Sequence, residues 1–100
     1  MKIVINKRYK GCFSFSDECA KMLGAEIIDC GDEGSYYEWK DGRHDEDFRT
    51  DPKLIELMES FGSNWCSSKF SKLKVVEIPD GINWRLMCGS GEEWIESIWE

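Results

Sequence analysis

Residues 73–84, Leu-Lys-Val-Val-Glu-Ile-Pro-Asp-Gly-Ile-Asn-Trp, decide the fold of this 100-residue chain. They include the densest run of β-branched residues in the sequence, Val75, Val76 and Ile78, and such a run favours a strand. A proline and an Asp-Gly pair follow, which are typical of a tight turn before another strand. We therefore expect a central strand here, then a turn, and then the beginning of the next strand.

Further strands are expected on both sides of this stretch. Runs of β-branched, aromatic or alternating apolar residues indicate them at residues 2–6, 26–29, 35–39, 82–88 and 93–99. A Gly89-Ser90-Gly91 turn separates the last two. Because short turns also join these two to the central strand, the C-terminal part of the chain predicts a three-stranded antiparallel meander.

Two helices are expected between the strands. The first begins at Ser16, a typical N-cap, and stops at Gly24. The second begins at Thr50-Asp51-Pro52, where a capping residue precedes a proline at the first helical position. Its buried stripe is expected to consist of Leu54, Leu57, Met58 and Phe61. The chain is thus predicted to be a single α+β domain, residues 1–100, with two helices packed on one face of a small, mainly antiparallel sheet.

Charge is distributed unevenly along the chain. The formal net charge is -7, and residues 29–51 alone carry nine acidic residues against three basic ones. A protein that holds nucleic-acid phosphates must bring cations to them, so this balance argues against direct binding of nucleic acid. An acidic surface instead attracts a protein partner with a basic surface.

The five cysteines favour reduced thiols over a disulfide framework, because their number is odd and their spacing irregular. The sequence has no Cys-x-x-Cys, and the lone histidine, His44, has no cysteine within ten residues, so we expect neither a metal nor a cofactor. No apolar run approaches the 18 or so residues that span a bilayer. These features predict a cytoplasmic protein with no membrane contact.

The sequence shows none of the common catalytic motifs. It contains no Gly-x-Ser-x-Gly, no phosphate-binding glycine loop and no His-Glu-x-x-His, and His44 lies in an acidic loop where we expect it to be solvated. We therefore predict that the chain is not an enzyme. A small cysteine-dependent or metal-dependent enzyme remains as a minor alternative.

The candidate binding site lies in the acidic segment. Residues 40–49 have a single apolar anchor, Phe48, and are expected to be exposed and mobile. Aromatic residues beside carboxylates have the composition of a surface that docks onto a basic groove. The candidate partner-binding residues are Tyr36, Tyr37, Trp39, Asp41, Asp45, Glu46 and Asp47. The competing interpretation is a solvated loop that keeps a small protein soluble. The other tryptophans, Trp65, Trp84, Trp94 and Trp99, are expected in the core or half-buried in the sheet.

Two segments carry a resemblance to a known family. The stretch Lys72 to Trp84, Lys-Leu-Lys-Val-Val-Glu-Ile-Pro-Asp-Gly-Ile-x-Trp, and the motif Arg49-x-Asp51-Pro52 resemble small, mostly uncharacterised proteins of bacteriophages and prophages. The chain departs from that pattern at Cys12, where the family has glycine, and after Trp94, where the family continues into a His-Arg-x-Trp tail. No chemistry is assigned to the family, and the resemblance implies a phage-encoded protein in the cytoplasm of a bacterial host.

Two functions from different classes follow. The leading hypothesis is a small acidic binding protein that inhibits or modulates a host protein, such as an anti-CRISPR or other anti-defence inhibitor that occludes a basic, nucleic-acid-binding surface. The alternative is a phage accessory or structural protein that self-associates, for example as a homodimer, through the edge of its C-terminal sheet.

Overall fold

Strands and helices are mixed along the chain, as the α+β prediction requires. The computed structural model describes residues 1–97. The helices are α1 (Asp17–Met22), α2 (Pro52–Phe61) and α3 (Ser63–Cys66), with two short 3-10 helices, η1 (Gly31–Glu33) and η2 (Asp45–Phe48). The strands are β1 (Lys2–Asn6), β2 (Glu26–Asp29), β3 (Ser35–Glu38), β4 (Leu73–Glu77), β5 (Trp84–Gly89) and β6 (Glu92–Ser97). All strand pairs are antiparallel, and the predicted class is confirmed.

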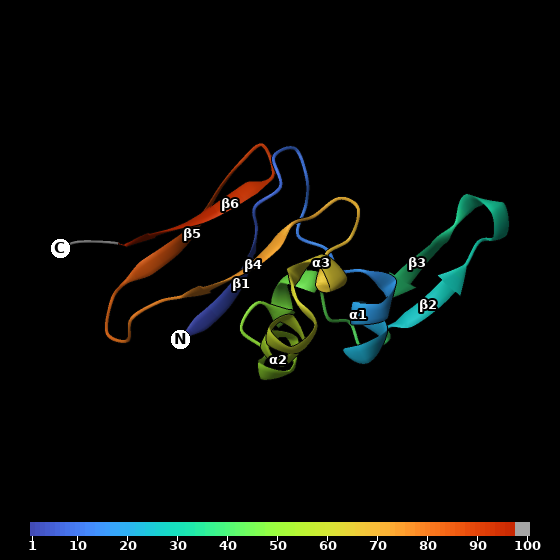
Figure 1. The fold of residues 1–100 in the computed structure, drawn as a ribbon, viewed down its shortest axis with the longest axis horizontal. Coiled ribbons are helices and arrows are strands. Elements are labelled where there is room, and N and C mark those ends of the chain that lie inside the picture. The colour runs from blue at the N-terminus through green and yellow to red at the C-terminus, as the bar shows by residue number, and fades with distance from the viewer. Residues whose placement is uncertain (98–100) are drawn as a thin grey trace.

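The predicted central strand, β4, pairs with β1 at the middle of the molecule (Figure 1). Val4 lies opposite Val75 and faces the helices, whereas Ile3 lies opposite Val76 and faces the β5–β6 hairpin. Both faces of this two-stranded ribbon are therefore covered. Strands that are buried on both faces read as continuous apolar runs, which explains why neither strand shows a polar-apolar alternation.

The predicted three-stranded C-terminal meander is wrong, because its first strand, β4, has a different partner. Its last two strands form the β5–β6 hairpin, but β4 pairs with β1 and not with β5, so the strands within residues 1–97 make three two-stranded sheets. Trp84, Leu86 and Ile95 of the hairpin pack on the apolar side chains of β1. As a second layer on the ribbon, the hairpin removes the apolar side chains of Ile3 and Ile5 from water. Residues 98 and 99 of the predicted last strand lie outside the described residues.

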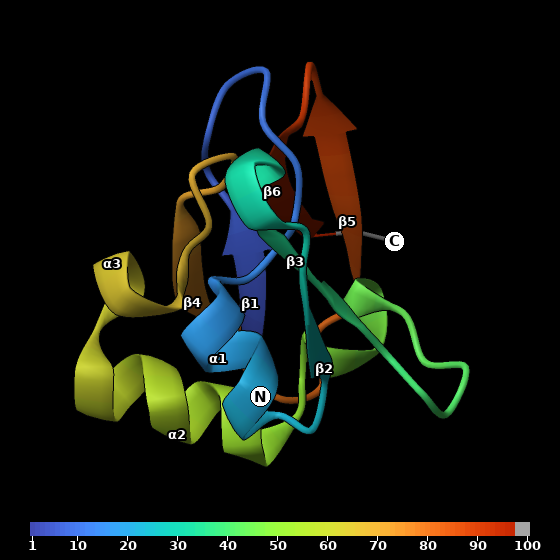
Figure 2. The same ribbon diagram turned by 90° about the vertical axis from the view of Figure 1, so that its right-hand side faces the viewer.

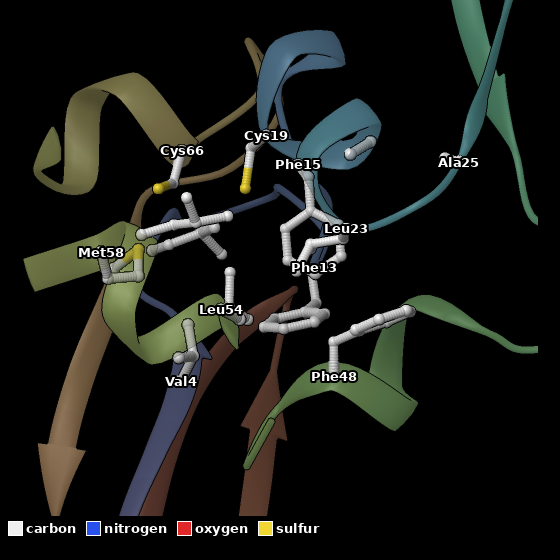
Figure 3. Close-up of a cluster of buried hydrophobic side chains, with 13 residues drawn as sticks. Val4, Phe13, Phe15, Cys19, Leu23, Ala25, Phe48, Leu54, Met58 and Cys66 are labelled. Carbon is white, nitrogen blue, oxygen red and sulfur yellow. The ribbon is translucent and has the colours of Figure 1, made fainter. Parts of the chain in front are cut away.

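The main core lies between the ribbon and the helices (Figure 3). Phe15 and Phe48 pack in it at right angles, with ring centroids 6.1 Å apart, and both are almost fully buried. The thiols of Cys19 on α1 and Cys66 on α3 point into the same interior. A hydrogen bond to Cys66, together with burial, raises the pKa of Cys19, so Cys19 remains a neutral thiol.

The predicted helix starts are confirmed by their caps. Ser16 Oγ accepts the amide N–H of Cys19 at 3.1 Å, and Asp51 accepts that of Lys53 at 2.7 Å, directly before Pro52. Phe61, expected on the buried stripe of α2, is instead 55% exposed. Its ring lies tilted against that of Trp65, with centroids 4.6 Å apart, on α3, a third helix that the two-helix prediction does not include.

The outer edge of β1 is closed by side chains. The amide of Val4 donates to the carbonyl of Arg49 at 2.8 Å, and the Arg49 guanidinium donates back to the Val4 carbonyl at 3.1 Å. The amide of Asn6 donates to Glu93 at 2.7 Å, and Glu93 pairs with Arg49 at 2.5 Å. Arg49 also lies 3.9 Å above the ring of Phe13. The end of the segment 40–49, predicted to be exposed, is therefore anchored in the interior by Phe48 and Arg49.

The molecule is elongated, with extents of 52 × 27 × 26 Å. The β2–β3 hairpin projects at one end of the long axis and the β5–β6 hairpin lies toward the other (Figure 1). Figure 2 views the molecule from the β2–β3 end. None of the helices in residues 1–97 has the length and apolar character needed to cross a membrane.

Candidate functional site

The projecting β2–β3 hairpin concentrates negative charge. Residues 26–38 contain five carboxylates and no basic residue, and all five carboxylate residues are exposed. Glu26 lies directly opposite Glu38 in the hairpin, and like charges in that position destabilise a strand pair. Lys40 lies 3.3 Å from Glu26 and offsets part of this repulsion. The tip, around η1, carries Asp32 and Glu33 with no ion-pair partner among residues 1–97.

A groove of about 820 Å³ runs along the base of this hairpin. Four segments that are distant in the sequence line it: the loop before α1, strand β3, the start of η2 and the loop after α3. A backbone bridge between Phe15 and Ser67 holds two of these segments together. The lining residues are Cys12, Ser14, Phe15, Ser16, Asp17, Ser35, Tyr36, Tyr37, Glu38, Trp39, His44, Asp45, Glu46, Ser67, Ser68, Lys69 and Phe70.

Asp45 organises one side of the groove. Its two carboxylate oxygens accept hydrogen bonds from the hydroxyl of Tyr37 at 3.0 Å and from the indole N–H of Trp39 at 2.8 Å. The hydroxyl oxygen of Tyr37 in turn accepts the amide N–H of Phe15 at 3.1 Å. Burial raises the pKa of Tyr37 above its ordinary value, and the neighbouring carboxylate of Asp45 raises it further, so the hydroxyl keeps its proton and donates.

An aromatic cluster supports this side of the groove from below. Trp39 stacks on Phe48 with ring centroids 4.5 Å apart and meets Tyr37 edge-on at 5.5 Å. The guanidinium of Arg43 covers the outer side of the cluster, 4.7 Å from the centroid of Phe48 and 2.6 Å from a carboxylate oxygen of Asp41. Hydrogen bonding to Arg43 lowers the pKa of Asp41. Through these contacts the cluster packs the β2–β3 hairpin against the core.

The structure brings together five of the seven predicted site residues. Tyr36, Tyr37, Trp39, Asp45 and Glu46 all line the groove. Asp41 and Asp47 do not line it: Asp41 pairs with Arg43, and Asp47 accepts the amide N–H of His44 at 2.8 Å, in a reciprocal cap of η2. Tyr37, Trp39 and Asp45 are half-buried and bond to one another, so they build the site and leave Tyr36 and Glu46 as its exposed members.

Sequence reasoning missed the other half of the groove. Asp17, Phe70 and the serines of the two loops contribute to the lining, and the N-cap at Ser16 is the one local signal that the sequence analysis identified among them. Ser14 and Ser68, 54 residues apart, share a hydrogen bond of 2.6 Å. No short-range pattern encodes that proximity, because it depends on how the two loops pack together.

Within residues 1–97, no three His, Cys, Asp or Glu side chains come together in a way that could hold a metal ion. Comparison with known proteins found no match to this chain among protein-family models, curated proteins or solved structures.

Proposed function

We propose that this chain is a binding protein that docks its acidic hairpin and the adjoining groove onto a basic surface of a protein partner. The observation that carries the proposal is the hairpin of residues 26–38, which projects from one end of the molecule with five exposed carboxylates and no base. Carboxylates placed on a projecting element attract a basic partner at a distance and then pair with it in the complex.

The stability cost of the hairpin also favours a binding role. The Glu26–Glu38 pair repels across the strands, and the short β2–β3 sheet has only two strands. A hairpin that served only as a connection would be more stable with opposite charges at these positions. Repulsive carboxylates at these positions are consistent with a basic partner that neutralises them in the complex.

The resemblance to small phage proteins supports a bacterial host protein as the partner. Host proteins that hold nucleic acid have basic surfaces, because phosphate binding requires cations. Occlusion of such a surface would inhibit the host protein, as in an anti-CRISPR or another anti-defence inhibitor. This assignment of partner class rests on resemblance and charge.

The test compares charge reversal at two sites. Asp32→Lys/Glu33→Lys alters the exposed hairpin tip, whereas Glu56→Lys alters an exposed position on α2 that does not line the groove. Tagged wild type and both variants are used to capture proteins from a bacterial lysate, and captured proteins are titrated at rising salt. A specific partner should be lost with the tip variant, retained with Glu56→Lys, and bind more weakly at higher salt. A partner retained equally by both variants would contradict the proposal.

A second function, self-association, is favoured by a different observation. Among the described residues the β5–β6 hairpin is a separate two-stranded sheet with no neighbouring strand at either edge, and Trp94 on it is 37% exposed. Exposed strand edges are templates for pairing with another chain. Light scattering after size-exclusion chromatography measures the mass directly: a dimer that dissociates in Trp94→Ala would support this function, and a monomer at high concentration would exclude it.

A further inference from the structure

We propose that the groove at the base of the hairpin is a subsite for an arginine side chain of the basic partner. This inference rests on the proposed function and deepens it, because it states which kind of basic residue is recognised and where. It requires three properties in the groove: exposed aromatic surface, carboxylates that are free to pair, and room for the side chain and its neighbours.

Exposed aromatic surface is present on two sides of the groove. Tyr36 on β3 is 51% exposed and Phe70 in the loop after α3 is 55% exposed, although both are large and partly apolar. A guanidinium is planar and weakly hydrated, so it stacks on an aromatic face better than the compact, strongly hydrated ammonium of lysine. These rings therefore favour arginine over lysine.

Free carboxylates are also present. Glu38 and Glu46 line the groove, and neither makes an ion pair within residues 1–97. The other two acids of the lining are already engaged, since Asp17 accepts the hydroxyl proton of Ser35 and Asp45 accepts from Tyr37 and Trp39. A carboxylate without an internal partner can accept two parallel N–H bonds from one guanidinium.

The charge balance and the size of the groove agree with this occupant. Four carboxylates line it, against the imidazole of His44 and one lysine, Lys69, whose amino group lies 5.3 Å from the ring centroid of Phe70. A cation therefore already lies near one of the two exposed rings. The volume of about 820 Å³ exceeds what one side chain fills, which leaves space for the flanking residues of an extended segment.

The chain itself binds arginine in this manner twice. Arg43 pairs with Asp41 at 2.6 Å and lies 4.7 Å from the centroid of Phe48. Arg49 pairs with Glu93 and lies 3.9 Å from the centroid of Phe13. In each case one carboxylate and one aromatic ring hold one guanidinium, and the groove offers the same two groups without an arginine between them.

The experiment uses three synthetic peptides with the full chain: nine lysines, the same peptide with arginine at its centre, and the same peptide with citrulline there. Citrulline keeps the shape of arginine but removes its charge. Titration calorimetry at low salt should show the arginine peptide binding about tenfold more tightly than the lysine peptide, with the citrulline peptide weakest. Equal binding of the arginine and lysine peptides would overturn the subsite.

Four variants separate the subsite from the hairpin. Tyr36→Ala and Glu46→Gln change exposed groove residues and should abolish the preference for arginine while the lysine peptide still binds. Lys69→Gln removes the resident cation and should strengthen arginine binding. Asp32→Lys/Glu33→Lys should weaken both peptides equally and leave their ratio unchanged.

The outcomes distinguish the two proposals. If the tip variant weakens all cationic peptides but arginine has no advantage, the arginine subsite is wrong and the acidic docking surface stands. If the tip variant changes nothing, the proposed function fails. An arginine preference that survives both Tyr36→Ala and Glu46→Gln would place the recognition outside this groove.

Discussion

The buried side chain of Glu93 stabilises strand β1, and a substitution there tests this contribution directly. It accepts the amide of Asn6 and pairs with Arg49, and both charged side chains are about nine-tenths buried. Glu93→Gln keeps the size but leaves the Arg49 charge without its partner, so we expect a loss of about 3 to 5 kcal/mol in the free energy of unfolding. Urea denaturation followed by tryptophan fluorescence measures this loss.

The adjacent residue provides a matched control for that substitution. Glu92 pairs with Lys7 at 3.4 Å, and both side chains are more than 30% exposed to solvent, where ion pairs contribute less than about 1 kcal/mol. Glu92→Gln should therefore leave the denaturation midpoint nearly unchanged. Equal effects of the two substitutions would show that the Arg49–Glu93 pair does not hold the edge of β1.

Tyr37 predicts a change of stability at alkaline pH. Its pKa is raised in the folded protein above the ordinary value of 10.0, so above about pH 10 the unfolded chain loses this proton while the folded chain keeps it. The stability that the hydroxyl contributes is complete below pH 10 and is lost as pH rises further. Tyr37→Phe should thus destabilise the protein at pH 7, and the difference from wild type should shrink between pH 10 and 11. A constant difference over that range would contradict the assignment.

The sequence indicated which kinds of residue occur at the candidate site, but it did not indicate which contacts each of them makes. The mixture of aromatic residues and acids between residues 36 and 47 indicated a segment that lines one side of the groove. Asp45 looks like its neighbours in the sequence, yet it is the half-buried acceptor for Tyr37 and Trp39. Its role depends on a turn of the chain that brings it back over β3, and composition carries no information about that turn.

At the scale of elements, β4 pairs with β1 and contributes apolar side chains to both hydrophobic clusters. Val76→Asp would place a charge beside Ile3, which is 2% exposed, against the apolar contact with the β5–β6 hairpin. We expect a loss of about 2 to 4 kcal/mol, a large share of the roughly 5 to 15 kcal/mol that stabilises a domain of this size. Thermal melting followed by circular dichroism gives the comparison.

Lys74→Asp is the control within the same strand. It introduces the same residue two positions earlier, on the same face, at an exposed site. Its effect should stay below about 1 kcal/mol. A cooperative melt of Val76→Asp at the wild-type temperature would show that β4 is not held between two apolar layers.

Elements could be predicted where the signal is local. The caps at Ser16 and Asp51 and the β-branched runs of β1 and β4 lie within a few residues of what they specify. The pairing of β4 was not predictable in that way. A neighbour in sequence, β5, and a distant strand, β1, were both available, and the choice depends on which arrangement buries both faces of the ribbon.

For the whole molecule, the reactivity of the five thiols measures how well the core is protected from solvent. Cys12, Cys30 and Cys88 are exposed, whereas Cys19 and Cys66 have no accessible surface. A thiol reagent should therefore modify three cysteines rapidly in the native protein and all five after denaturation without reductant. Fewer than five in the denatured protein would reveal a disulfide, and five rapid reactions in the native protein would show that the core opens readily.

The closure of β1 has a consequence for the synthesis of the protein. The amide of Asn6 meets its acceptor on Glu93 only 87 residues later, and the amide of Ile78 pairs back with Met1. At a translation rate of about 5 to 20 residues per second, Ile3, Val4 and Ile5 wait roughly 4 to 17 s for their neighbours. During that interval the apolar strand β1 has no partner for its edge, and the charges of Lys2 and Lys7 at its two ends oppose pairing with the strands of other chains.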